Sequence, residues 1–259
     1  MTIASLLEPV DGKPGARRLT HADEWMQGRT LYGGASALIA FTMAQRAFAG
    51  LPPLRAGQIG FVAPVGEDIE LSAEMVREGR NVTQVRSEIR CGGRLALTAF
   101  WLFAAERPAN ARREADPPAD WPGPPDQNAQ AMKGEGPSFI RNNFELRFGQ
   151  AKDADHGATV RRWARLTGDH GLDPVSRLVL MGDVMPPGAM RIMDRAGPIS
   201  SINWSFNVLD PESRSEGGWY LAENASQHAD AGYSAERLRM WDSAGRQVLD
   251  GIQCVAVFG

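Results

Sequence analysis

A carboxylate stands among apolar residues at Asp183, the last residue of the run Leu180-Met181-Gly182-Asp183. Burying an ionised carboxylate is costly unless it is paired or has a chemical role. In that position it can act as a general base that takes a proton from a bound water. The alternative is a structural carboxylate that hydrogen bonds to a neighbouring loop. The sequence leaves both interpretations open.

A glycine pair, Gly33-Gly34, opens an apolar run from Ala35 to Ala49 that is typical of a buried helix. The first N–H groups of a helix have no partner inside the helix, and glycine lets a ligand approach them closely. Gly33 and Gly34 are therefore candidates for binding the oxygen of a reacting carbonyl. Close packing of the helix against a sheet explains the same glycines equally well.

The bulk composition argues against several classes of function. The net charge is −3, which leaves no basic surplus for a nucleic-acid backbone. The two cysteines form no zinc motif, and no serine-nucleophile, dinucleotide or P-loop motif occurs. We therefore expect no metal and no cofactor. No signal peptide and no apolar run long enough for a membrane span is evident, so we expect a cytoplasmic protein with free thiols.

A proline-rich segment, 105–137, divides the chain into halves of similar length. It holds seven prolines and few large apolar residues, and proline disfavours both helix interiors and central strands. We therefore predict a first unit at 1–104, a surface linker at 105–137 and a second unit at 138–259.

Both halves show the same order of elements, which indicates a degenerate repeat. After the first helix, period-two alternation and turn residues predict strands at 58–63, 69–77, 82–90 and 94–103. In the second half we predict strands at 139–148 and 159–166, a helix over 175–185, and strands at 199–209, 218–228, 233–242 and 246–258. Each half reads as one helix wrapped by a long antiparallel sheet, an α+β arrangement. We expect the two sheets to join into one.

Several segments resemble the acyl-CoA thioesterase II (TesB-like) family. In the first half these are Tyr32-Gly33-Gly34, the run 58–64 and the run 78–86; in the second they are the run 201–206, Trp219-Tyr220-Leu221, the run 245–248 and Gln253. The resemblance covers nearly the whole chain outside the linker. It implies a tandem (double) hotdog fold and hydrolysis of acyl-CoA thioesters by direct attack of an oriented water, with CoA present only as part of the substrate.

The resemblance also implies site residues. The family's water-holding trio of Asp, Thr or Ser, and Gln falls on Asn203, Ala225 and Gln253, with Ser226 beside Ala225. We therefore take Asn203, Gln253, Ser226 and Asp183 as catalytic candidates. Further substrate-binding candidates are Gln58, where several family members carry a histidine, and Arg80 in the run 78–86.

Asn203 decides between the two main hypotheses. Its amide can orient water but cannot act as a base near neutral pH, which leaves a thioesterase with another base or a non-catalytic acyl-thioester binding protein. We expect Asn203 to point into the cleft beside Gln253. A hotdog hydratase is a third possibility, but it needs an Asp and a His on one short segment. We also expect a homo-oligomer, most simply a dimer that covers free sheet edges.

Overall fold

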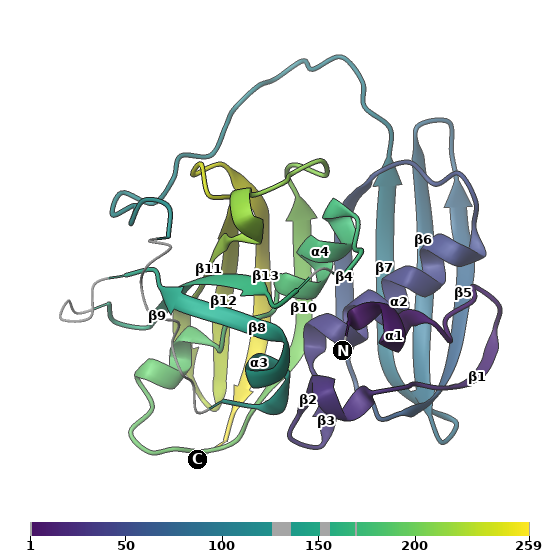
Figure 1. The fold of residues 1–259 in the computed structure, drawn as a ribbon, viewed down its shortest axis with the longest axis horizontal. Helices are drawn as coiled ribbons and strands as arrows, with labels where there is room; N and C mark the ends of the chain where they lie inside the picture. Colours follow the sequence, from purple (N-terminus) through teal and green to yellow (C-terminus); the bar gives the residue numbers. More distant parts are fainter. Residues whose placement is uncertain (1, 126–135, 151–155, 169, 259) are drawn as a thin grey trace.

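A computed structural model describes residues 2–125, 136–150, 156–168 and 170–258. Within these residues, eleven strands form one antiparallel sheet in the order β1-β5-β6-β7-β4-β10-β13-β12-β11-β9-β8 (Figure 1). The first half contributes β1 (Gly15–Arg18), β4 (Leu54–Phe61), β5 (Asp68–Glu78), β6 (Val82–Cys91) and β7 (Arg94–Ala104). The second half contributes β8 (Phe144–Phe148), β9 (Thr159–Leu166), β10 (Ile199–Val208), β11 (Tyr220–Asp230), β12 (Tyr233–Trp241) and β13 (Gln247–Val257).

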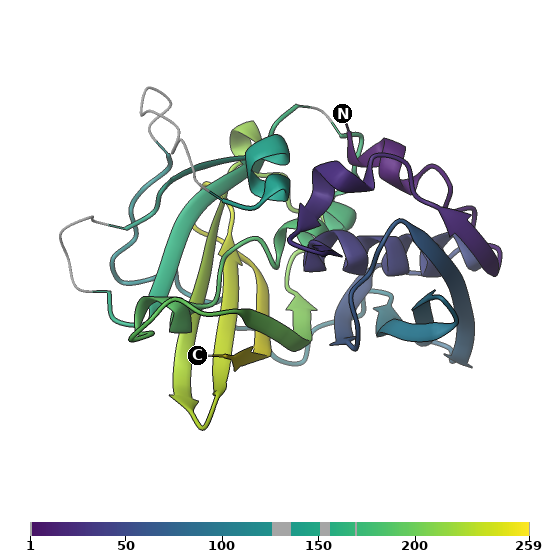
Figure 2. The same cartoon turned by 90° about the horizontal axis from the view of Figure 1, so that it is seen from below.

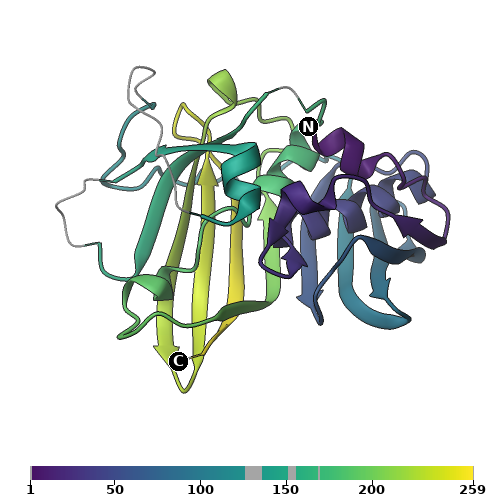
Figure 3. The ribbon, with the colours of Figure 1, turned by 60° about the horizontal axis from the view of Figure 1, so that its bottom comes forward.

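The two half-sheets join where β4 pairs with β10, with Ile59 opposite Trp204. Figure 3 shows the strands of both halves continuing side by side across this junction. This is the α+β double hotdog that the sequence predicts, with its two sheets fused into one. A separate two-stranded hairpin, β2 (Met26–Gln27) with β3 (Thr30–Leu31), precedes the first long helix.

The first long helix, α2 (Gly33–Ala47), is buried along most of its length. It lies on the inner face of β5, β6 and β7, and its many small residues allow that close approach. Figure 2 shows α2 between this sheet and the N-terminal segment that carries α1 (Ile3–Leu7). Arg46, in the last turn of α2, donates to the carbonyl oxygens of Leu7 and Val10. The predicted helix is therefore confirmed, with both its start and its end two residues earlier than expected.

The second helix, α4 (Pro174–Met181), begins as expected, because the Asp173 carboxylate accepts a hydrogen bond from the backbone N–H of Ser176. The predicted end at 185 is wrong, since the helix stops at Met181. Gly182 caps the helix, its N–H donating to the carbonyl oxygen of Leu178, and a side chain there would collide with the indole of Trp204. Asp183 consequently lies just after the helix.

The prediction of one strand over 139–148 is wrong for the first half of that segment. Residues Ser138–Asn143 form helix α3, and only β8 is extended. The Asn143 amide caps this structure by donating to the carbonyl oxygens of Phe139 and Glu24. A six-residue helix leaves too short a pattern for helical periodicity to be distinguished from alternation.

The described part of the linker, 105–125, arches from the end of β7 across to the second half (Figure 1). Trp121 packs edge-on against Trp163 of β9, and Asp120 forms an ion pair with Arg161 at 2.8 Å. The linker crosses the surface as expected but is anchored there. Residues 126–135 lie outside the described residues, and the predicted unit boundaries stay predictions.

The described ranges also contain three short 3₁₀ helices: η1 (Ala22–Trp25), η2 (Gly188–Arg191) and η3 (Glu216–Gly218). Of these, η2 matters for the site, because it lies against β9, β11 and β12. Among the described residues, no helix is long and apolar enough to cross a membrane.

Candidate active site

Asp183 lies where the end of α4 meets the start of α2. Its Oδ1 accepts a hydrogen bond of 2.9 Å from Nε2 of Gln253 on β13. Its Oδ2 faces Gly33, where a β-carbon would collide with it, and the Phe61 ring borders the same spot. The structure therefore brings together three of the residues singled out from the sequence: Asp183, Gln253 and Gly33.

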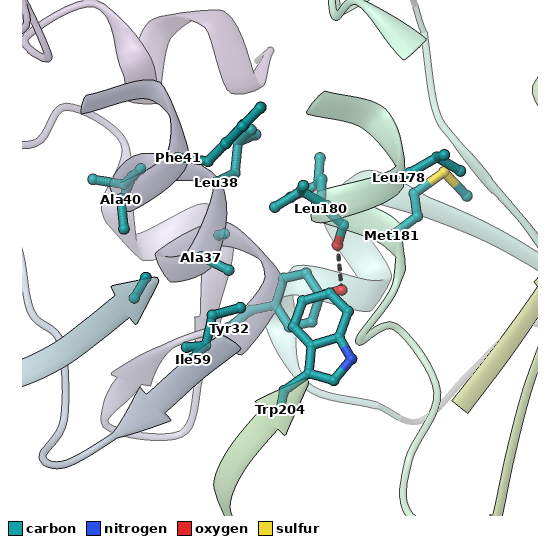
Figure 4. Packing of buried hydrophobic residues seen from close by; sticks show 14 of the residues in the cluster. Tyr32, Ala37, Leu38, Ala40, Phe41, Ile59, Leu178, Leu180, Met181 and Trp204 are labelled. Carbon is teal, nitrogen blue, oxygen red and sulfur yellow. Dashed lines mark hydrogen bonds between the residues drawn. The ribbon is translucent and has the colours of Figure 1, made fainter. Parts of the chain in front are cut away.

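Tyr32, the residue before α2, holds the two helices in this arrangement. Its hydroxyl donates to the carbonyl oxygen of Leu180 at 2.5 Å, the bond drawn in Figure 4. A β-carbon at Gly34 would collide with the same carbonyl oxygen. Gly33 and Gly34 are thus required for close approach, and that approach sets Gly33, the first residue of α2, beside the Asp183 carboxylate. The two interpretations of the glycine pair are compatible.

The environment makes Asp183 suited to accept a proton. Burial among protein atoms raises the pKa of Asp183 to about 7, and the hydrogen bond from Gln253 opposes this only in part. The residue as a whole is intermediate in burial, between the fully buried core and the surface. A carboxylate with a pKa near the operating pH is well matched to general-base catalysis.

The inner face of the second half-sheet, the one covered by α4 and η2, carries further polar groups. Directly opposite residues of antiparallel strands share a face, and one row across the strands reads Trp204, Gln253, Glu236 and Ser226. The next row begins with Ser201, which lies opposite Val255. Ser201 is therefore a hydroxyl on the same face as Gln253 and one step away from it. Sequence reasoning missed this residue.

Ser226, by contrast, belongs to a second polar cluster. Its Oγ lies 2.8 Å from Oγ of Ser234, which donates to Glu236 at 2.6 Å. The buried Glu236 carboxylate also accepts the backbone N–H groups of Gly188 and Ala189, at 2.8 and 3.1 Å. Glu236 lies directly opposite Gln253. The cluster thus fixes the segment after Asp183 onto the sheet, and the Ser226 hydroxyl is engaged there and not with Asp183.

The expected position of Asn203 is wrong. Asn203 alternates regularly with Trp204 and Phe206, whose side chains are buried on the inner face, so Asn203 is exposed on the outer face. There its Oδ1 accepts the backbone N–H of Cys254 at 2.9 Å. A bulge in β10 between Ser201 and Asn203 leaves Ile202 exposed as well. Gln253 is buried on the opposite face.

Two substrate-binding candidates also lie away from the group formed by Asp183, Gln253 and Gly33. Gln58 is exposed on the outer face, opposite Ser205. Arg80 is exposed in the turn between β5 and β6, and two strands separate β5 from β4. In the described part of the chain, no group of three or more His, Cys, Asp or Glu side chains could hold a metal ion.

The position of Asn203 leads to a first prediction. Because Asn203 lies on the outer face and away from Asp183, Asn203→Ala should leave kcat/KM on any thioester substrate within about twofold. It should also change the free energy of unfolding by no more than about 0.5–1.5 kcal/mol, the range for a surface site that loses one hydrogen bond. Steady-state kinetics and urea denaturation measure both. A loss of turnover comparable to that of Gln253→Leu would contradict this geometry.

Comparison with known proteins agrees with this architecture. The sequence model of the acyl-CoA thioesterase N-terminal domain matches residues 21–104, and that of the C-terminal domain matches residues 110–257. The chain therefore belongs to the acyl-CoA thioesterase family, as the resemblance implied. No curated protein matches the chain.

Solved structures show the same fold over the whole chain. A putative thioesterase II from Thermobifida fusca matches with a TM-score of 0.80 and 19% identity, covering 100% of this chain and 98% of that one. A TesB protein from Mycobacterium avium subsp. paratuberculosis matches with a TM-score of 0.73 and 18% identity, covering 100% of both chains. A putative thioesterase from Novosphingobium aromaticivorans matches with a TM-score of 0.73 and 22% identity, covering 95% and 96%. At these identities, the matches establish the double hotdog fold.

Proposed function

We propose that the chain hydrolyses acyl-CoA thioesters to the free acid and CoA, with Asp183 as the general base. The observation that carries this proposal is the contact of Asp183 with Gln253 beside the first turn of α2. It unites a proton acceptor, an amide that can orient water and a set of backbone donors. These are the groups that direct hydrolysis of a thioester needs.

The proposed reaction begins with a water held between Asp183 and Gln253. The water oxygen attacks the thioester carbonyl carbon while the Asp183 carboxylate takes one of its protons. The carbonyl oxygen becomes an oxyanion, which the N–H groups at Gly33 and Gly34 stabilise. The carbon–sulfur bond then breaks, and the proton on Asp183 passes to the leaving thiolate. The hydroxyl of Ser201 is available to bind the same water.

The alternative of a non-catalytic binding protein loses its main support. It depended on an amide, Asn203, in the place of the base. A carboxylate, Asp183, contacts Gln253 instead. Homo-oligomerisation stays a prediction. Light scattering that finds a single 28.2 kDa particle at every concentration would contradict it.

The release of free thiol from a panel of acyl-CoA esters, from short to long chains, tests the function directly. The wild type should release thiol faster than Gln253→Leu and Asp183→Asn on at least one member. Equal rates for all three proteins across the panel would leave the chain without the proposed activity.

The pH dependence gives a second prediction. The base must be ionised to accept a proton, and its pKa is about 7. We therefore expect kcat/KM to rise about tenfold per pH unit below pH 7 and to level off above it. Activity on one acyl-CoA between pH 5 and pH 9 measures this profile.

Gln253 offers the matched control for that profile. Its hydrogen bond lowers the pKa of Asp183, so in Gln253→Met the rise should move to higher pH while the plateau drops. A profile that is flat from pH 5 to pH 9 in the wild type would rule out a base of this pKa.

A further inference from the structure

The proposed base and the proposed oxyanion donors come from different halves of the chain. Asp183 follows α4 in the second half, whereas Gly33 begins α2 in the first half. The distance between them is therefore set by the way the end of α4 packs on the start of α2. A misplacement of about 1 Å between reacting groups can cost about 10²-fold in rate, so a residue that fixes this packing affects catalysis.

Tyr32 joins the two helices directly. Its backbone N–H donates to the carbonyl oxygen of Trp25 at 2.9 Å, and its own carbonyl oxygen accepts the N–H of Ser36 in the first turn of α2 at 3.0 Å. Its hydroxyl donates to the carbonyl oxygen of Leu180 at 2.5 Å (Figure 4). One buried residue thus holds the start of α2 with its backbone and the end of α4 with its side chain.

The Leu180 carbonyl belongs to the last turn of α4, where carbonyl groups lack a partner within the helix. In a longer helix it would accept the N–H of Val184, but that N–H donates to the carbonyl oxygen of Met181 at 3.1 Å. The Tyr32 hydroxyl supplies the donor instead. Without it, the segment that leads into Asp183 would lose this hydrogen bond to the first half.

The Tyr32 hydroxyl also lies close to Asp183. A β-carbon on Gly33 would collide with the Asp183 carboxylate, and one on Gly34 would collide with the Tyr32 hydroxyl, so the two groups lie over successive residues of one helical turn. Burial, together with the nearby Asp183, raises the pKa of Tyr32 well above its ordinary value. The phenol therefore stays protonated at neutral pH and keeps donating to α4.

The ring of Tyr32 is held separately from the hydroxyl. It stacks on Phe139 of α3 with the ring centroids 4.1 Å apart, and it meets Phe144 of β8 edge-on at 6.1 Å. Removing the hydroxyl alone should leave this aromatic packing in place. Tyr32→Phe is therefore a specific probe of the hydrogen bond to α4.

We propose that Tyr32 is a positioning residue for the hydrolysis, because its hydroxyl fixes the Asp183 carboxylate relative to the first turn of α2; this inference rests on the proposed function. In Tyr32→Phe the Leu180 carbonyl loses its donor, the end of α4 can shift, and the space of one oxygen atom opens near Asp183. Water that enters this space solvates the carboxylate, and better solvation lowers the pKa of a buried acid.

The test compares Tyr32→Phe with Tyr220→Phe. Tyr220 is also buried, and its hydroxyl donates to the carbonyl oxygen of Ser213 at 3.3 Å. It precedes Ser226 by six residues on β11, or about 20 Å along a strand, and Ser226 lies in the row that holds Gln253. The control therefore removes the same atom from a buried tyrosine away from the site.

For Tyr32→Phe we expect kcat on acyl-CoA to fall at least about tenfold while KM changes less than about threefold. The pH at which kcat/KM reaches half its plateau should move down by at least about half a unit, because Asp183 is better solvated. Tyr220→Phe should match the wild type in both. If the two variants behave alike, or if kcat falls while the pH profile stays in place, Tyr32 does not position the base.

A measurement without substrate separates this inference from the proposed function. The chain has three tyrosines, Tyr32, Tyr220 and Tyr233, so 3-fluorotyrosine at all three gives resonances that single Phe variants assign by fluorine NMR. The Tyr32 resonance should shift with a midpoint at about pH 7, where Asp183 ionises, and Asp183→Asn should abolish that shift. The other two resonances should titrate alike with and without Asp183.

This titration decides the inference wherever the kinetics do not. If the wild type hydrolyses no thioester, the proposed function fails, and the dependence of the Tyr32 resonance on Asp183 shows by itself whether the two groups are coupled. The same holds if Tyr32→Phe does not fold. A protein that hydrolyses acyl-CoA while its Tyr32 resonance is indifferent to Asp183 would keep the function and refute the inference.

Discussion

Asp183→Asn should lower kcat/KM on acyl-CoA by about 10²–10⁴-fold, the usual contribution of a general base. The amide keeps the size of the side chain and can still accept a hydrogen bond from Gln253 through its oxygen, so the site should keep its shape. It cannot take a proton from water near neutral pH. Substrate binding, measured as the affinity for CoA, should stay within a few-fold of the wild type.

The same substitution should stabilise the fold at neutral and alkaline pH. The folded pKa of Asp183 is about 7, well above the ordinary value of 3.8, so between pH 4 and pH 7 the folded protein holds a proton that the unfolded chain has lost. Wild-type stability therefore falls as pH rises through this window, and the penalty persists above it. The pKa shift sets an upper limit of about 4 kcal/mol on this loss of stability, and the actual loss should be smaller because the residue is partly exposed.

Urea denaturation at pH 5 and pH 8 measures this effect. Asp183→Asn should gain stability over the wild type at pH 8 and gain less at pH 5. The control Asp23→Asn removes an exposed carboxylate and should change neither activity nor stability. Loss of activity together with an equal loss of stability at both pH values would mean that Asp183 is a structural residue.

Most strands of this fold could be predicted from the sequence because their inner and outer residues alternate. The β6 pattern, with Val85, Ser87 and Ile89 inward, is an example, and the observed strand matches its prediction within a residue. Helix ends were harder. The apolar run continues to Met185, and its pattern does not report that α4 already ends at Met181, with Gly182 against the indole of Trp204 on a strand far along the chain.

The candidate site was partly predictable for the same reason. Asp183 was recognisable as a carboxylate in an apolar run, which needs only local information. Asn203 was misplaced because the family resemblance assigned the polar side of this strand to the cleft, whereas Gln253 shares the face of Trp204, and no pattern in one strand tells which face lines the site. Ser201 was missed because a bulge between Ser201 and Asn203 places Ser201 on the inner face, and bulges leave no clear trace in one sequence.

Glu236 was missed although a signal was present. Along β12, Glu236 alternates in phase with Leu238 and Met240 and is as buried as they are. A charge on the apolar face of an alternating strand is the same kind of anomaly as Asp183. Reading the second half for buried charges, and not only for the family's trio, would have found it.

Glu236→Leu should destabilise the fold by about 3–5 kcal/mol. The Glu236 carboxylate accepts the N–H groups of Gly188 and Ala189 and the hydroxyl of Ser234. Leucine would leave the two backbone donors buried without an acceptor, while the Ser234 hydroxyl could donate to Ser226. Each such orphaned group costs about 1–3 kcal/mol. Gly188 cannot move aside, because even a β-carbon there would collide with Ala158 and Ser226.

Glu236→Leu should also lower catalysis. Gly188 follows Asp183 by only five residues, and the hydrogen bonds from Gly188 and Ala189 to Glu236 hold the segment between them on the sheet. In Glu236→Gln, which keeps one acceptor oxygen, we expect a smaller loss of about 1.5–3 kcal/mol. A fall in kcat that exceeds any change in KM should accompany it. Urea denaturation and steady-state kinetics measure both, with Glu70→Leu, an exposed site on β5, as the control expected to stay within about 0.5 kcal/mol. If Glu236→Leu is as stable as Glu70→Leu, the segment after Asp183 is held by other contacts, and the Glu236 carboxylate does not position the base.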